Sequence, residues 1–287
     1  FGEWFLAAAG GYRLGEVIYE IIPGPFGREK LCAWGSGRGR DCPFERTGLR
    51  FGSPEPLPRP YGAGLRLHAR DLPGSLRALT LELVTYDELP WLDICYRLDK
   101  APNPEAEALY VAFPLAWKPE CALVTDHRPD RQSPGEGGSP ITVHLDCPGA
   151  VYRPGLDQVP GTATDWHSLQ HYFAVENGER TVVVAAPDIP LVQINGLNTG
   201  KWQETLPPPN GLVMSWVMNN YWFTNFPAAQ GGGFTWRYRL HVLPGGFDRQ
   251  TADALARTVR QPLAAVALPW GPGRSHNRST ETQEARQ

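Results

Sequence analysis

The chain has 287 residues, enough for one large domain or two smaller ones with a proper hydrophobic core. Its 27 basic and 30 acidic residues leave a net charge of −3, without the basic patch that nucleic acid requires. Its apolar runs fall short of the ~18 residues that a membrane-spanning helix needs. We therefore expect neither nucleic acid nor a membrane among its partners.

The 31 glycines and 29 prolines are spread along the chain, which is typical of many turns between short strands. The five cysteines form no C-x-x-C pair and leave one over, which favours reduced thiols in a cytoplasmic protein. The opening FGEWFLAAAG carries Glu3 and only a short apolar run, unlike a signal peptide. Because the chain begins with Phe1, we expect it to be a piece of a longer protein.

The first half of the chain predicts successive half-buried strands. Residues 17–22 form a short apolar run, and alternation of apolar and polar residues follows at 79–84, 92–98 and 109–115. The alternation restarts at 141–145. Turn-forming residues separate these runs, as in an antiparallel sandwich.

A β-hairpin is predicted at residues 166–175 and 180–186. The two runs flank Asn177 and Gly178, and Asn-Gly is the strongest short-range hairpin signal because both central residues of a type I′ turn need positive φ. We expect these two segments to pair as neighbouring strands.

The stretch at 211–243 combines two strand patterns with many aromatic and Asn residues. The first part is apolar on both faces, as in a doubly buried strand, and the part from Phe234 alternates with a period of two. A Gly-rich loop separates them, so we expect a strand pair. Aromatic rings beside amides suit a sugar-binding surface, and a Trp-rich sandwich core is the alternative interpretation.

One helix is predicted at residues 248–260, with Asp248 as N-cap and Ala254, Leu255 and Val259 as its packing side. Residues 271–287 are polar, and we expect a disordered tail there. We expect residues 1–270 to form a single mainly β domain.

Two constellations of polar residues resemble reactive sites. His167 and His171 have i, i+4 spacing, but on a strand this separates them by about 13 Å, so we expect no shared metal ion. Asp157, Asp165 and His167 surround a Gly- and Pro-rich loop and could serve acid–base chemistry. Alternatively, Asp165 organises the turn into the strand.

Four runs of the sequence resemble the C-terminal half of glycoside hydrolase family 38, the α-mannosidases and their bacterial relatives. They are YVAFPLAW (110–117), VYRPGLDQVPGTATDWHSLQHYFAV (151–175), PLVQINGLNTGKWQ (190–203) and GLVMSWVMNNYWFTNFPAAQGGGFTWRYRL (211–240). The resemblance covers residues 10 to 265, and the last run is its most specific part. It implies a large antiparallel β supersandwich, similar to the galactose-mutarotase-like fold.

The resemblance also implies where the chemistry lies. In that family an N-terminal (β/α) barrel supplies an Asp nucleophile and the zinc ligands, and this chain has no matching His-x-Asp pair in an α/β context. We therefore expect no catalytic residue, metal site or cofactor on this chain. The expected partners are the catalytic barrel of the parent protein, with its zinc, and a mannoside-type carbohydrate.

The resulting prediction is a non-catalytic, carbohydrate-facing sandwich region of a retaining α-mannosidase-like glycosidase. The residues expected to face the sugar or the barrel are Asp165, Trp166, His167, Asn219, Tyr221, Trp222, Asn225 and Arg237. One alternative is a stand-alone mutarotase-like sugar epimerase that uses His167 or His144. Another is a carbohydrate-binding module without an enzyme parent.

Overall fold

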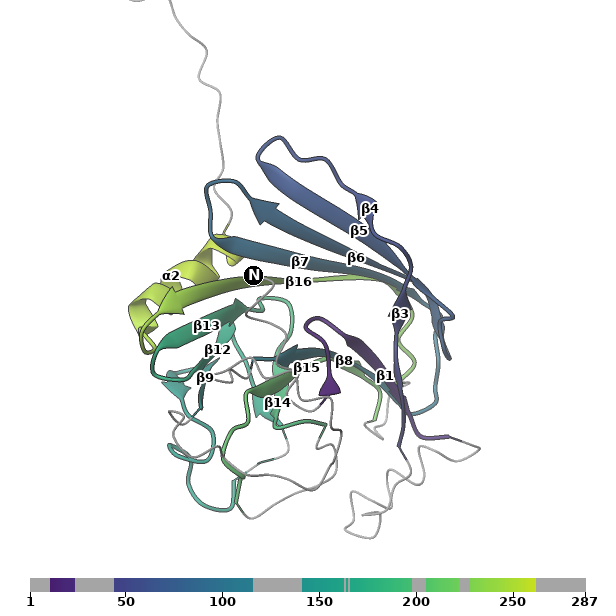
Figure 1. The fold of residues 1–287 in the computed structure, drawn as a ribbon. Coiled ribbons are helices and arrows are strands. Elements are labelled where there is room, and N and C mark those ends of the chain that lie inside the picture. The colour runs from purple at the N-terminus through teal and green to yellow at the C-terminus, as the bar shows by residue number, and fades with distance from the viewer. Residues whose placement is uncertain are drawn as a thin grey trace, which may run out of the picture.

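In a computed structural model of the chain, residues 11–23, 44–115, 141–162, 164, 166–197, 205–221 and 228–261 are described. Over these residues the fold is mainly antiparallel β, with two large sheets and one helix at the C-terminal end (Figure 1). The expected class, a large antiparallel supersandwich with one short helix, is confirmed.

The smaller sheet has six strands in the order β11-β14-β15-β8-β1-β2. Their bounds are β1 (Val17–Ile21), β2 (Glu45–Gly48), β8 (Glu107–Pro114), β11 (His167–Ser168), β14 (Leu191–Ile194) and β15 (Leu212–Asn219).

The larger sheet has ten strands in the order β10-β9-β12-β13-β16-β7-β6-β5-β3, with β4 also paired to β5. Their bounds are β3 (Arg50–Phe51), β4 (Glu55–Pro56), β5 (Gly62–Arg70), β6 (Leu76–Tyr86), β7 (Trp91–Lys100), β9 (Thr142–Cys147), β10 (Ala150–Tyr152), β12 (Tyr172–Glu176), β13 (Arg180–Ala185) and β16 (Gly232–Pro244).

The main core lies between the two sheets and is rich in aromatic rings. Phe113 of β8 lies edge-on to Tyr238 of β16, with ring centroids 4.8 Å apart, and Tyr96 of β7 stacks on Trp236 at 5.2 Å. The Tyr238 hydroxyl donates to Ser215 Oγ of β15 at 2.9 Å. These rings come from both sheets. The aromatic positions that alternate with polar residues along each strand are therefore the ones that face the other sheet.

The central stretch differs from its prediction in one respect. The doubly buried strand β15 and the alternating strand β16 both exist, but they do not pair with each other. β15 lies between β14 and β8, whereas β16 lies between β13 and β7 in the other sheet. The expected strand pair was wrong because alternation identifies the buried face of a strand and not its neighbour.

The hairpin is confirmed, with corrections to its turn and to its first strand. β12 pairs with β13, and Gly178 has a φ of +86°. Asn177 does not have a positive φ, and its backbone N–H donates to the carbonyl of Arg180, so the central residues of the turn are Gly178 and Glu179. Residues 167–168, however, form β11 and pair with β14 in the six-stranded sheet. The chain therefore changes sheets between Ser168 and Tyr172.

The helix α2 (Arg249–Arg260) is confirmed, with the Asp248 side chain accepting from Thr251 N. It packs on the outer face of the ten-stranded sheet, over Tyr172 and Val183. Its buried residues are Ala252 and Ala256, and the predicted Leu255 and Val259 pack partly buried beside them. Ala254 is exposed, which corrects the predicted packing side at that position. Two alanines one turn apart let the helix axis approach the sheet closely.

Several predictions fall outside the described residues. These are the tail at 271–287 and the positions of Asp165, Trp222 and Asn225. Cys95 and Cys147 carry free thiols, in agreement with the expected reduced cysteines, and the other three cysteines are outside the described ranges. In the described part, the helix is neither long nor apolar enough to cross a membrane.

Candidate functional site

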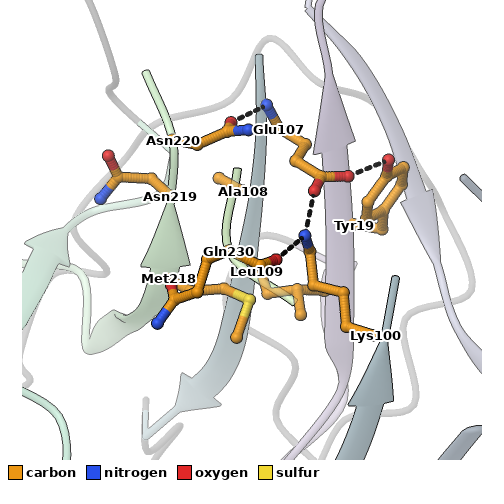
Figure 2. Close-up of a pocket in the computed structure, with 9 residues that line it drawn as sticks. All are labelled: Tyr19, Lys100, Glu107, Ala108, Leu109, Met218, Asn219, Asn220 and Gln230. Atoms are coloured by element: carbon orange, nitrogen blue, oxygen red, sulfur yellow. Dashed lines mark hydrogen bonds and ion pairs between the residues drawn. The ribbon is translucent and has the colours of Figure 1, made fainter. Parts of the chain in front are cut away.

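A buried ion pair joins the two sheets where β7 ends and β8 begins. Figure 2 shows the Glu107 carboxylate between Tyr19 of β1 and Lys100 of β7. Lys100 Nζ lies 2.5 Å from Glu107 Oε1, and the Tyr19 hydroxyl donates to Oε2 at 2.7 Å. Both charged side chains are 4% exposed. Burial and the Glu107 carboxylate raise the pKa of Tyr19 well above its usual value, so this hydroxyl keeps its proton.

Further donors saturate the same carboxylate. Ser75 Oγ and Asn103 Nδ2 each donate to Glu107 Oε2 at 2.8 Å. The ammonium of Lys100 also donates to the carbonyl oxygen of Gln230 at 2.6 Å. Every polar group of the pair therefore has partners, which is the condition under which a buried ion pair is tolerated.

Asn220 fixes the loop beside this ion pair. Its Oδ1 accepts from Glu107 N at 2.6 Å, and its Nδ2 donates to backbone carbonyls of Asn103, Glu105 and Ala228. The cavity lined by the ion pair has a volume of about 10 Å³. That space is about one water molecule, so a sugar does not fit here. Asn219 also lines it, and its Oδ1 is buried without a partner among the described residues.

A second buried carboxylate, Glu20, lies on the outer face of the six-stranded sheet. Its Oε1 accepts from the hydroxyls of Tyr221 at 2.5 Å and Tyr110 at 2.9 Å, and its Oε2 accepts from Arg46 Nε at 2.6 Å. Burial raises the pKa of Tyr221 far above its usual value. The predicted site residue Tyr221 is thus a buried donor to a structural carboxylate.

Stacked rings surround Glu20. Trp216 stacks on Tyr110 with centroids 5.7 Å apart and lies 6.2 Å from the ring of Tyr221. Trp166 packs against the same cluster. Trp216 is 5% exposed and Tyr221 is 7% exposed, so their ring faces are covered. The aromatic and Asn-rich pattern of 211–243 therefore belongs largely to cores on both sides of β15.

His167 lies in the interior, away from these rings. It is 3% exposed, and the Tyr152 hydroxyl is 2.9 Å from its Nδ1. Its Nε2 is buried without a partner among the described residues. Burial lowers the pKa of His167 from 6.5 to about 4, so the imidazole is neutral at pH 7.

This shift predicts a specific dependence of stability on pH. The unfolded chain binds a proton at this histidine near pH 6.5 and the folded chain only near pH 4, so stability falls as pH drops through that window. The contribution of His167 amounts to about 3 kcal/mol. We expect the unfolding free energy of the His167→Gln variant to fall less between pH 6.5 and 4. The mostly exposed His68 supplies the control His68→Gln, and parallel curves for wild type and H167Q would contradict the prediction.

The remaining histidines of interest have partners of their own. His144 Nε2 lies 2.8 Å from Glu176 Oε1 and its ring stacks on Phe247, and His171 Nδ1 lies 2.7 Å from Asp146 Oδ2. His171 also contacts Arg260. No group of three or more His, Cys, Asp or Glu side chains within the described ranges could hold a metal ion.

Asp157 organises a turn. Its carboxylate accepts from the backbone N–H of Arg153 at 2.8 Å and also pairs with the guanidinium of Arg153. These hydrogen bonds lower the pKa of Asp157 to about 2. It lies at the surface and is fixed in the ionised state. The sequence predicted a turn-forming role for Asp165, which lies outside the described residues, and the structure shows such a role for Asp157.

The structure does not bring the described site candidates together. Trp166 and Tyr221 share the outer aromatic cluster of the six-stranded sheet, and Asn219 lies at the end of β15 beside the Lys100–Glu107 pair. Arg237 lies on the outer face of the other sheet and pairs with Asp188 at 2.9 Å.

Sequence reasoning missed Glu20, Lys100 and Glu107. A signal existed for Lys100, since it continues the inward positions of Leu98 and Tyr96 along β7. A Lys at an inward position indicates a buried counter-charge. Nothing local to the sequence identifies Glu107 as that partner.

Known structures share this fold. No protein-family model matches the sequence, and no curated protein matches it. Among solved structures, an α-mannosidase from Enterococcus faecalis V583 matches with a TM-score of 0.54, 12% identity and 86% of this chain covered. A protein in the Glycosyl Hydrolase Family 38 from Enterococcus faecalis matches with a TM-score of 0.52, also at 12% identity and 86% coverage. The chain spans 28% of the length of each of these two.

A galactose mutarotase-like protein from Clostridium acetobutylicum also matches, with a TM-score of 0.35 and 8% identity. The match covers 68% of this chain and 66% of that one. The likeness to the two Enterococcus faecalis chains shows the fold alone, a β-supersandwich of the kind that forms part of those longer chains. The weaker likeness carries no inference about function.

Proposed function

We propose that this chain is the sandwich portion of a glycoside hydrolase related to the α-mannosidases. In this proposal it packs on a catalytic barrel and does not itself cleave glycosidic bonds. The observation that supports it is the match of 86% of this chain to 28% of an α-mannosidase chain. Zinc, if required, belongs to the barrel, and the substrate is a mannoside-type carbohydrate. We place the protein in the cytoplasm, in keeping with its free thiols.

The state of the buried carboxylates supports a non-catalytic role. A retaining glycosidase needs two carboxyl groups about 5–5.5 Å apart, one ionised as nucleophile and one able to give up a proton. Glu20 and Glu107 are each held by three or more donors inside closed packing. A carboxylate held in this way cannot reach a sugar.

The candidates for contact with sugar or barrel keep their place in the proposal. Trp166, Asn219 and Tyr221 lie in or beside the six-stranded sheet, and Asp165, Trp222 and Asn225 are their neighbours in sequence. We infer that this side of the sandwich meets the barrel. His167 and Arg237 are less suited, because one is interior and the other lies on the opposite sheet.

The epimerase alternative gains no support from the two histidines on which it rests. His167 faces the space between the sheets, whereas His144 contacts Phe247 on the outer side of the ten-stranded sheet. The alternative needs only one of them, but His167 is buried and the buried ring of His144 is stacked on Phe247, so neither lies on an open face. Polarimetry of freshly dissolved aldose is the direct assay, and we expect the chain to leave the rate of anomer interconversion unchanged.

The proposal is tested on the purified chain and on its gene. We expect no turnover of an aryl α-mannoside, with or without added zinc. We also expect the coding sequence to continue upstream of Phe1 into a stretch of alternating β and α patterns with His-x-Asp motifs. Mannoside turnover by the isolated chain would overturn the non-catalytic role. A start codon directly before Phe1 would leave a free-standing sandwich and refute the link to a barrel.

A further inference from the structure

A groove of about 330 Å³ crosses the outer face of the ten-stranded sheet. Its floor is formed by β6, β7 and β16, and Thr258 and Val259 of α2 line one side. Arg59 and Tyr61, which precede β5, line the other. Figure 1 shows α2 at one end of this sheet and β4 and β5 at the other. The volume lies in the range of small-molecule sites in proteins.

One end of the groove is aromatic. Tyr61, which is 51% exposed, stacks on Tyr86 with an interplanar angle of 12° and centroids 5.7 Å apart. Trp91 lies edge-on to Tyr86, and the guanidinium of Arg239 lies 4.3 Å above the Trp91 ring. Such rings present a flat apolar surface of the kind that packs against the C–H face of a sugar ring.

Next to the rings, positive charge exceeds negative charge. Arg66 binds Oε1 of Glu82 through two hydrogen bonds of 2.7 and 2.9 Å. Arg59 at 3.8 Å and Arg97 at 3.9 Å form ion pairs with Oε2 of the same carboxylate, but both lie beyond hydrogen-bond distance. Arg59 Nε is buried without an acceptor among the described residues. Arg97 is 61% exposed.

The other two carboxylates at the groove are occupied. Asp93 accepts two hydrogen bonds of 2.6 Å from Arg239 and a third of 2.6 Å from the Tyr86 hydroxyl. Asp188 accepts from the Arg237 guanidinium at 2.9 and 3.0 Å. The groove and its paired side chains therefore combine five arginines with three carboxylates, an excess of two positive charges, because Arg59 and Arg97 share Glu82 with Arg66.

We propose that this groove binds a sugar ring that carries an anionic group. The anionic group accepts hydrogen bonds from the guanidinium groups of Arg59 and Arg97, whose paired N–H donors match carboxylate, sulfate or phosphate oxygens. The sugar ring lies against the ring of Tyr61. This site lies on the sheet opposite to the side proposed to meet a barrel. It does not depend on the proposed hydrolase parent, because it rests only on side chains of this chain.

Calorimetry on the complete chain tests the site with three probes. These are an oligosaccharide of glucuronate residues, the neutral glucose oligosaccharide of equal length, and inorganic sulfate alone. We expect the acidic oligosaccharide to bind, and the other two probes to bind at least tenfold more weakly. Arg97→Gln should raise the Kd by about tenfold, the loss expected for a charge-assisted hydrogen bond. Tyr61→Ala should also raise the Kd for the acidic oligosaccharide.

The matched control is Arg153→Gln, which removes the same charge from an exposed turn away from the groove. We expect its Kd to equal that of the wild type. No binding of the acidic oligosaccharide, equal binding of its neutral counterpart, or an R97Q variant with unchanged Kd would each overturn the proposal. Sulfate that binds as tightly as the oligosaccharide would also overturn it, because the ring would then contribute nothing.

Thiol alkylation gives an independent readout without a mutation. Cys95 lines the groove and is only partly buried, whereas Cys147 lies in β9 with its thiol donating to the carbonyl of Ala150. We expect the acidic oligosaccharide to slow alkylation of Cys95, followed by peptide mass spectrometry, and to leave Cys147 unaffected. Equal rates at Cys95 with and without the oligosaccharide would count against the site.

Discussion

Replacing Lys100 by Met is expected to lower the free energy of unfolding by about 3–5 kcal/mol. The variant keeps the length of the side chain and leaves the Glu107 carboxylate buried without its counter-charge at 2.5 Å. The carbonyl oxygen of Gln230 also loses its donor. Urea denaturation followed by tryptophan fluorescence measures the change.

The controls separate buried charge from charge in general. The pair Arg153–Asp157 lies at the surface, and we expect Arg153→Gln to lower the unfolding free energy by less than about 1 kcal/mol. The double variant Lys100→Met with Glu107→Gln should be more stable than Lys100→Met alone, since it removes the uncompensated charge. A single variant as stable as the wild type would show that the pair does not hold the two sheets together.

Replacing Glu20 by Gln is expected to lower the unfolding free energy by about 2–3 kcal/mol. Glu20 is fully buried and accepts from three donors, and an amide offers one acceptor oxygen where the carboxylate offers two. Arg46 Nε or one tyrosine hydroxyl would therefore lose its partner.

Two variants that each remove one donor to Glu20 provide a comparison for this loss of stability. Tyr221→Phe and Arg46→Gln each remove one donor and leave the carboxylate in place, so each should cost less than Glu20→Gln. A Glu20→Gln variant with wild-type stability would contradict the prediction. The same urea titration distinguishes these outcomes.

The sequence predicted the strands more reliably than their partners. Alternation from Phe234 to Val242 and the hairpin around Gly178 both reflect local geometry, and both agree with the structure. The supposed pairing of β15 with β16 failed because each strand buries a face against the same core from opposite sheets. For the helix, the predicted Leu255 and Val259 do pack on the sheet, whereas Ala254 is exposed and the buried positions are Ala252 and Ala256.

The site was less predictable than the fold for a physical reason. The aromatic and Asn residues at 211–243 are residue types that occur both in sugar-binding faces and in cores that need hydrogen bonds. Only the tertiary contacts distinguish them, such as the Tyr221 hydroxyl on Glu20, 201 positions earlier in the chain. The groove over β6, β7 and β16 is lined by four arginines that come from distant segments, and no short motif identifies it.

The two sheets exchange strands repeatedly along the chain. The first two strands belong to the smaller sheet, the next five to the larger one, and β8, β11, β14 and β15 return to the smaller sheet among strands of the larger one. Neither sheet is therefore formed by one continuous segment of the chain. Truncating the chain at most positions would remove strands from both sheets. The many contacts between residues distant in sequence make the folding of this chain slow compared with that of a helical bundle of equal length.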